Sequence, residues 1–248
     1  MLAEEATGRY LPQKQVFSTY CDKVLSAPRR GDKVQIELCS HEEADTRLVL
    51  HLLDAAHAGH EKIMIRTCNT GVVVIILSKL ASIPMAREVW ISFGERKHHR
   101  YIAAHTIAAT LGPTKAPALA VFHAFTGNDT TSFFAGIGKR TAWKTWDVFP
   151  DVTDAFSLLA NATPSIIDST YDVLEKYVVL SYDKTCQLTQ VNEARHHLFA
   201  RRSRALENIP PTQAALKQHI LRTAYQAGHV CGQSLQKEAI LPSPANWG

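Results

Sequence analysis

The sequence predicts a mixed α/β fold, in which a mainly parallel sheet with flanking helices is followed by an all-helical C-terminal half. Stretches with strand character at 33–39, 62–67 and 88–94 alternate with helical segments as far as residue 112. Beyond that point only helical segments follow. We therefore assign an α/β region to 31–125 and a helical region to 126–236, and expect extended or poorly ordered ends at 1–30 and 237–248.

The first strand and helix follow from local signals. The stretch "KVQIELC" at 33–39 alternates apolar and polar residues, which predicts a strand. Ser40 and Glu43 then form an S-x-x-E capping box, followed by apolar residues at helical spacing. Gly59 supplies the stop signal of this helix.

The rest of the α/β region continues the alternation. Residues 62–67 and 88–94 are apolar and rich in β-branched or aromatic side chains, which predicts two buried strands. Residues 101–112 predict a helix that Gly112 and Pro113 end. Because strands that alternate with helices pair in parallel, we expect helices on both faces of the sheet.

The second half predicts helices only. Its segments have helical periodicity and are separated by prolines at 150, 164, 210 and 211. The predicted helices lie at 118–127, 139–149, 151–160, 165–182, 191–202 and 211–228.

Composition excludes several classes of protein. With 46% hydrophobic and 20% charged residues, the chain of 248 residues resembles an ordinary soluble globular protein. Its longest apolar run, 71–77, is far shorter than the roughly 20 residues that span a bilayer, so no membrane association is expected. No secretory leader is visible, which favours a nuclear or cytoplasmic location. The five cysteines form no C-x-x-C pair, which argues against a disulfide framework and a zinc finger.

The net charge of +4 comes from the C-terminal quarter of the chain. There the stretch "RHHLFARRSR" at 195–204 gathers basic residues. Contact with phosphates and a simple solvated helix face are both compatible with this pattern, and the sequence leaves the two open.

Carboxylates follow the predicted strands in two places. Glu42, Glu43 and Asp45 lie after 33–39, and Asp129 lies where the helical half begins. Ligands of open α/β sheets bind beyond the carboxyl ends of the strands, and divalent cations prefer carboxylate oxygens. A purely structural explanation stays open, because acids in a first helical turn favour the helix dipole and Asp129 suits an N-cap.

The stretch "GIGKR" at 136–140 suggests a phosphate-binding turn. Gly136 and Gly138 allow backbone amides to approach an anion closely, and the helix that opens at Lys139 directs its positive end the same way. Lys139 and Arg140 add charge for contact with a nucleic-acid backbone. A tight turn between two helices is the alternative.

Taken together, these segments resemble the flap-endonuclease branch of the PIN-like nucleases. The counterpart of that family's E-x-E pair is Glu43-Ala44-Asp45, its G-x-D is Gly127-Asn128-Asp129, and its helix–turn–helix clamp is 136–140. The resemblance implies a PIN-like fold and a DNA partner in preference to RNA. It also implies metal-assisted phosphodiester hydrolysis, with Mg²⁺ or Mn²⁺ on Glu43, Asp45 and Asp129 as metal and catalytic residues.

Four further stretches resemble largely uncharacterised, often multicopy invertebrate proteins for which a mobile-element ancestry is inferred. They are "SHEEADTR", "RYIAAH", "FHAFTGNDT" and "GHVCGQ", and the similarity covers about 31–248. These proteins commonly continue into a cysteine-rich tail, so we expect a fragment or a decayed copy.

Two departures from the nuclease pattern affect the expected activity. The family's D-x-D pair is replaced by Asn69-Thr70-Gly71, and no first metal-binding aspartate is recognisable in 1–30. Each missing carboxylate weakens the field that holds a cation. The sequence therefore leaves two hypotheses: a catalytically impaired nuclease that binds nucleic-acid backbone, or a non-catalytic module that binds nucleic acid or protein.

Two other functions find less support in the sequence. His98, His99 and His105 are close together but lack tetrahedral zinc spacing with a cysteine or an acid. A small-molecule α/β enzyme would be expected to carry a glycine-rich nucleotide loop after a strand, and none is visible.

Overall fold

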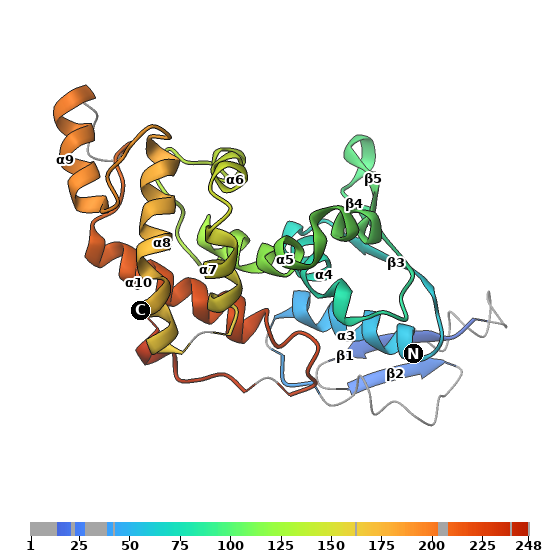
Figure 1. Ribbon diagram of the computed structural model, residues 1–248. Helices are drawn as coiled ribbons and strands as arrows, with labels where there is room; N and C mark the ends of the chain where they lie inside the picture. Colours follow the sequence, from blue (N-terminus) through green and yellow to red (C-terminus); the bar gives the residue numbers. More distant parts are fainter. Residues whose placement is uncertain are drawn as a thin grey trace.

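The computed structural model describes residues 14–20, 23–27, 39–41, 43–161, 163–202, 208–238 and 240–247. It confirms a mixed α/β fold in which helices predominate and the sheets are small. Figure 1 shows the strands at one end of the molecule and the C-terminal helices at the other, with α3, α4 and α5 between them. Within the described residues, none of the helices combines the length and apolar character needed to cross a bilayer.

The central sheet has three strands in the order β3-β4-β5. The predicted strands at 62–67 and 88–94 are confirmed as β3 (Lys62–Thr67) and β4 (Glu88–Phe93), which pair in parallel. β5 (Arg100–Ala103) pairs antiparallel with β4, so the expectation of a helix beginning at residue 101 is wrong there. The reason is the short link after Gly94, because so few residues can only reverse the chain into an antiparallel neighbour.

The two faces of this sheet differ in the exposure of their side chains. Ile65, Val89 and Ile91 point into the core, whereas Met64 and Tyr101 on the opposite face are 63% and 61% exposed. On this second face Ser92 is nevertheless 5% exposed, and the ring of Trp90 packs against His105. Helices on both faces of the sheet stay a prediction.

A second, two-stranded sheet lies near the N-terminus. β1 (Val16–Tyr20) and β2 (Lys23–Ala27) form an antiparallel hairpin in a region for which the sequence predicted no element. Val24 and Ala27 are buried, which ties the hairpin to the rest of the fold. The strand predicted at 33–39 falls almost entirely on residues outside the described ranges.

The helix after the acidic stretch starts later than the capping box implied. α3 (Ala44–His57) has Glu43 at its N-cap, and no side chain caps it. The hydroxyl of Thr46 instead donates to the Glu43 carbonyl at 2.8 Å and contacts His41 Nδ1 at 3.0 Å. The predicted Ser40–Glu43 capping box is therefore wrong, and the Glu43 side chain does not cap α3.

Two further helices complete the first half. α4 (Thr70–Lys79) follows β3, and α5 (Ala104–Phe125) follows β5. The predicted break at Gly112 is present as a kink within α5, where its φ of +78° departs from helical geometry. Beyond the kink, α5 includes the helix predicted at 118–127 and ends at Phe125.

Among the described residues, the second half contains helices and no strand, as predicted. It contains α6 (Lys139–Val148), α7 (Val152–Leu159), α8 (Pro164–Tyr182), α9 (Val191–Arg202) and α10 (Gln213–Ala224). A π-helical turn, Tyr225–Val230, continues α10.

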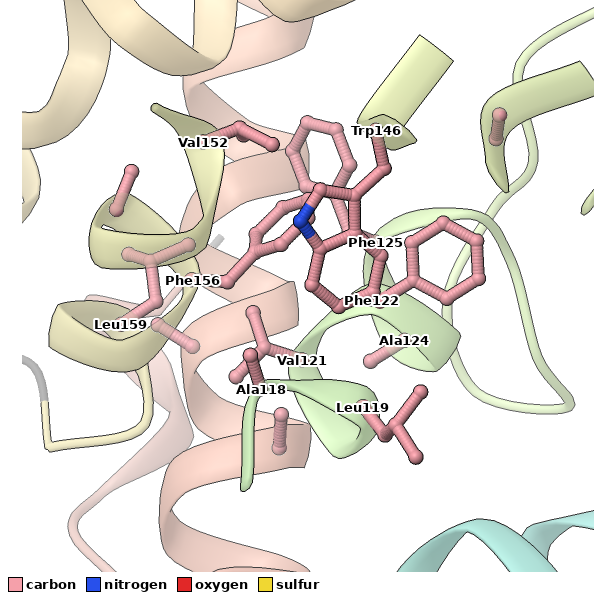
Figure 2. Packing of buried hydrophobic residues seen from close by; sticks show 14 of the residues in the cluster. Ala118, Leu119, Val121, Phe122, Ala124, Phe125, Trp146, Val152, Phe156 and Leu159 are labelled. Carbon is pink, nitrogen blue, oxygen red and sulfur yellow. The ribbon is translucent and has the colours of Figure 1, made fainter. Parts of the chain in front are cut away.

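The core is continuous through both halves. Figure 2 shows Phe122 and Phe125 of α5 packed against Trp146 of α6 and Phe156 of α7. Trp146 is only 1% exposed, so its ring belongs to the core. The aromatic cluster thereby holds the last turn of α6 against the end of α5.

Candidate functional site

A cleft of about 230 Å³ lies where the first turns of α3 and α4 meet the end of α5. Carboxylates and polar groups from sequence-distant segments line it. They include Glu43, Asp45, Asn69, Gly71, His123, Asp129, Lys139, Gln226 and Cys231. Three of the four carboxylates that the sequence singled out therefore share one cleft, and the fourth, Glu42, lies outside the described residues.

Asn69 joins the first turns of two helices inside the cleft. As the N-cap of α4, its Oδ1 accepts a hydrogen bond from the Gly71 amide at 2.7 Å. Its Nδ2 donates to Asp45 Oδ2 at 2.6 Å. Both polar ends of the amide are thus engaged within the protein.

Gly71 faces the same carboxylate. A Cβ at this position would lie 3.0 Å from Asp45 Oδ2 and 3.1 Å from Asn69 Oδ1. Positions 69 and 71 therefore both border Asp45. Acidic side chains at these positions would add to the carboxylate cluster, whereas the residues present add one neutral amide and no side chain.

The charge of the cluster shifts the ionisation of Asp45. Burial raises the pKa of its carboxyl, and the nearby Glu43 and Asp129 carboxylates raise it further. Like charges held this close favour uptake of a proton or another cation. The cleft is thus an electronegative pocket.

The residues present do not fit a two-metal centre. In the described part of the chain, no three His, Cys, Asp or Glu side chains are arranged to hold a metal ion. Asp45 Oδ2 already accepts from Asn69, and Asn69 Oδ1 already caps α4. Two-metal catalysis needs enough oxygens to hold two ions about 3.5–4 Å apart, and this cleft lacks them.

No protein family, curated protein or solved structure matches this chain. The chemistry of the cleft therefore follows from its own residues.

The Lys139 side chain points toward the end of α5 and not toward a position where it would contact phosphate. Its ammonium donates to the carbonyl of His123 at 2.9 Å, to Thr126 Oγ1 at 2.9 Å and to the Gly127 carbonyl at 2.5 Å. An ammonium has three donors, so all of them are used at the end of α5. Although Lys139 as a residue is exposed, desolvation of its ammonium lowers the pKa to about 8. Lys139 thus ties α6 to α5, and this arrangement contradicts its predicted role as a phosphate ligand.

Three residues of the cleft were missed by the sequence analysis. His123 has its pKa lowered to about 4, first by burial and then by the charge of Lys139. Burial, followed by the charge of Glu43, raises the pKa of the Cys231 thiol to about 12, so this thiol is protonated at neutral pH. Gln226 comes from the π-helical turn. His123 lies in the stretch "FHAFTGNDT" and Cys231 in "GHVCGQ", whereas Gln226 lies in neither. Nothing local in these stretches indicates that the residues share a pocket.

The turn at 136–140 leads directly into α6. Gly136 has a φ of +73°, a conformation that favours glycine, and Gly138 is the N-cap of α6 in extended conformation. No side chain caps this helix. The Thr141 amide donates to the Gly138 carbonyl at 2.9 Å, whereas the amides that precede it at the start of a helix have no partner within the helix. A Cβ on Gly138 would meet open space. An anion can therefore approach these amides, with the exposed Arg140 beside them.

Proposed function

We propose that this protein binds the phosphate backbone of DNA through the turn at 136–140. The adjoining carboxylate cleft is that of a flap-endonuclease-like, divalent-metal phosphodiesterase with impaired catalysis. The observation that carries the proposal is that Lys139, the first residue of α6, lines the same cleft as Glu43, Asp45 and Asp129. A strand that rests on the turn would thus pass beside the carboxylates.

Backbone binding is supported by the uncapped start of α6. The N-terminus of a helix carries roughly half an elementary positive charge, which favours anions such as phosphate. Gly136 and Gly138 keep side chains away from these amides, and Arg140 supplies a charge that can pair with a second phosphate oxygen. None of these groups reads base edges, so the binding is independent of sequence.

Impaired catalysis is supported by the contacts of Asp45. A neutral amide from Asn69 occupies one of its oxygens, and Gly71 contributes no oxygen from a side chain. Mg²⁺ and Mn²⁺ would therefore find too few ligands for the two-ion chemistry of the family that the sequence resembles. The same observation favours a second candidate function, a non-catalytic module that binds nucleic acid or protein.

Fluorescence anisotropy with a labelled flap duplex across a salt series tests backbone binding. The logarithm of the binding constant should fall with the logarithm of salt concentration, by roughly 0.9 per phosphate neutralised. Arg140→Ala should reduce this slope by about one for every base sequence. Lys217→Ala, in which an exposed lysine on α10 is lost, serves as the matched control. Absence of binding at low salt would refute the proposal.

Gly138→Val tests the approach of phosphate to the amides. The backbone at Gly138 has φ −81° and ψ 162°, which any residue adopts, and a Cβ meets no atom within 4 Å. The variant should therefore keep its melting temperature and lose DNA affinity. Unchanged affinity would show that the turn is only a connection between helices.

Cleavage is tested separately on the same flap duplex. We expect little or no hydrolysis with Mg²⁺ or Mn²⁺. Efficient metal-dependent cleavage that Asp129→Ala abolishes would show that the impairment is overestimated. DNA binding without cleavage by the unaltered protein fits both candidate functions. It would show that the partner is a nucleic acid and not a protein.

A further inference from the structure

Phe133 is an exposed aromatic side chain on an otherwise firmly held loop. Phe133 is 75% exposed, whereas Thr131 and Phe134 are 5% and 6% exposed. The loop connects Asp129 of the cleft with the turn at 136–140. Isolated exposed apolar residues are common on proteins, so the significance of Phe133 depends on how the loop holds it.

Side-chain hydrogen bonds fix the loop before Phe133. Asn128 Oδ1 accepts from the Thr130 and Thr131 amides at 3.0 and 2.8 Å. The Thr131 hydroxyl donates to the Ala124 carbonyl at 2.5 Å. These bonds tie the first part of the loop to the end of α5.

A buried histidine fixes the loop next to Phe133. His219 Nε2 lies 2.8 Å from the Phe125 carbonyl, and its Nδ1 lies 3.1 Å from Ser132 Oγ. A carbonyl only accepts, so Nε2 carries the proton and Nδ1 accepts from the Ser132 hydroxyl. The ring of Phe134 then packs on His219 within the core. Phe133 is therefore held between two anchored residues and cannot turn inward without breaking these contacts.

Gly127 places Phe133 at the rim of the cleft. It lines the cleft, and its carbonyl accepts from the Lys139 ammonium. Its φ is +97°, and a Cβ built on it would lie 2.6 Å from Phe133 Cβ. Phe133 thus packs directly against a residue that touches both the carboxylate cleft and the first residue of α6.

We propose that the ring of Phe133 stacks on an unpaired base of the nucleic acid whose backbone rests on the turn at 136–140. This inference rests on the proposed function. Aromatic side chains stack on bases of any sequence, and a base inside a duplex already has both faces covered. Phe133 therefore recognises an unpaired base, which adds preference for strand ends, gaps or flaps to the sequence-independent contact with phosphates.

The surroundings of Phe133 fit a base better than a protein partner. The neighbouring Thr130 and Ser132 are exposed and polar, so the ring is not part of a wide apolar patch. Stable protein interfaces bury at least roughly 1,200 Å² in total, which a single ring does not approach. One flat ring beside the uncapped start of α6 matches one base and one phosphate of a nucleotide.

Fluorescence anisotropy on the full chain tests the proposal with two DNA probes. One is a blunt duplex, and the other is the same duplex with a short flap that contains 2-aminopurine. Phe133→Ala should weaken binding to the flap probe by roughly five-fold to a hundred-fold, the range of base stacking, and leave blunt-duplex affinity and its salt slope unchanged. Phe133→Trp should retain the flap preference. The control Phe199→Ala, which removes another exposed phenylalanine on α9, should change neither affinity.

The fluorescence of 2-aminopurine supplies an independent measurement. The unaltered protein and Phe133→Trp should quench it, and Phe133→Ala should not. Unchanged flap affinity in Phe133→Ala, or equal losses on both probes, would overturn the stacking proposal while salt-dependent duplex binding still supports the proposed function. Binding to neither probe would overturn both. If Phe133→Ala abolished self-association in sedimentation and left flap binding unchanged, the ring would belong to a protein interface instead.

Discussion

Asn69 Nδ2 lies 2.6 Å from Asp45 Oδ2 and donates a hydrogen bond to it, joining the first turn of α4 to that of α3. This bond stabilises the cleft without a metal ion, because an amide donor satisfies a carboxylate that would otherwise face Glu43 and Asp129 alone. Asn69 therefore stabilises the cleft, but the same hydrogen bond occupies an Asp45 oxygen that could otherwise bind a cation.

Asn69→Asp should make the fold sensitive to divalent cations. A carboxylate at position 69 would repel Asp45, so the melting temperature should fall in EDTA. Addition of Mn²⁺ should restore it, since a ligand at 100 times its Kd stabilises the folded state by about 2.7 kcal/mol. Thermal denaturation with and without MnCl₂ measures both effects. The unaltered protein, which should respond weakly to Mn²⁺, is the control, and equal responses of the two proteins would contradict this prediction.

Gly71→Asp, added to Asn69→Asp, should strengthen the response to Mn²⁺ further. The new Cβ at position 71 would lie 3.0 Å from Asp45 Oδ2, so the Asp45 side chain must move slightly to accommodate the substitution. Gly71→Ala on the same background separates this steric effect from the added charge. The prediction fails if the alanine and aspartate variants respond equally to Mn²⁺.

Lys139→Met should raise the pKa of His123 above its value of about 4. The Lys139 charge is one of the causes that lower this pKa, while burial, the largest cause, stays in place. The pKa should therefore remain below 6.5. NMR titration of the His123 ring measures the shift, and Arg140→Ala is the control that should leave it unchanged. An unaltered pKa in Lys139→Met would show that the ammonium lies farther from the ring.

Lys139 should also affect how stability depends on pH. Its pKa falls from 10.5 to about 8 on folding, so between these values the unfolded chain binds more protons than the folded one. Stability from this group therefore increases as pH rises from about 8 towards 10.5. Urea denaturation of the unaltered protein and of Lys139→Met is compared at about pH 7.5, below this window, and at about pH 9.5, within it. The difference between the two proteins separates the contribution of Lys139 from that of other titrating groups. The unaltered protein should gain stability relative to the variant; a relative loss would contradict the assignment.

Trp146→Ala should destabilise the protein by about 3–5 kcal/mol, because it empties a fully buried site among aromatic rings. Its indole also donates to Thr153 Oγ1 at 2.8 Å, and this bond is lost with it. Trp143→Ala, which removes a partly buried neighbour, should cost less. Chemical denaturation measures both variants. Equal losses would show that the two tryptophans contribute alike to the core.

Much of the secondary structure was predictable from the sequence, since its signals are local. Apolar stretches marked β3 and β4, and the periodicity of apolar residues marked the helices of the second half. Mistakes arose where local signals conflicted with the path of the chain. Residues 101–103 have helical neighbours, yet the short link from β4 makes them a strand. Ser40 and Glu43 match a capping box, yet α3 begins at Ala44.

The candidate site was predictable in its carboxylates but not in its contacts. The rule that ligands lie beyond the ends of strands led to Glu43, Asp45 and Asp129, and these line one cleft. The rule does not give the direction of a flexible side chain. Lys139 was expected to face phosphate, but three oxygens at the end of α5 receive its ammonium.

The sequence by itself determined the strands β3 and β4 and the helices of the second half, where acidic residues concentrate, and that positions 69 and 71 carry no carboxylate. These features depend on residue type and on neighbours a few positions away. Only the tertiary structure decided that Asn69 bonds to Asp45, that Lys139 ties α6 to α5, and that Phe133 stays exposed beside the cleft. Each of these outcomes depends on packing between residues distant in sequence, because burial and hydrogen-bond geometry are set by the whole fold.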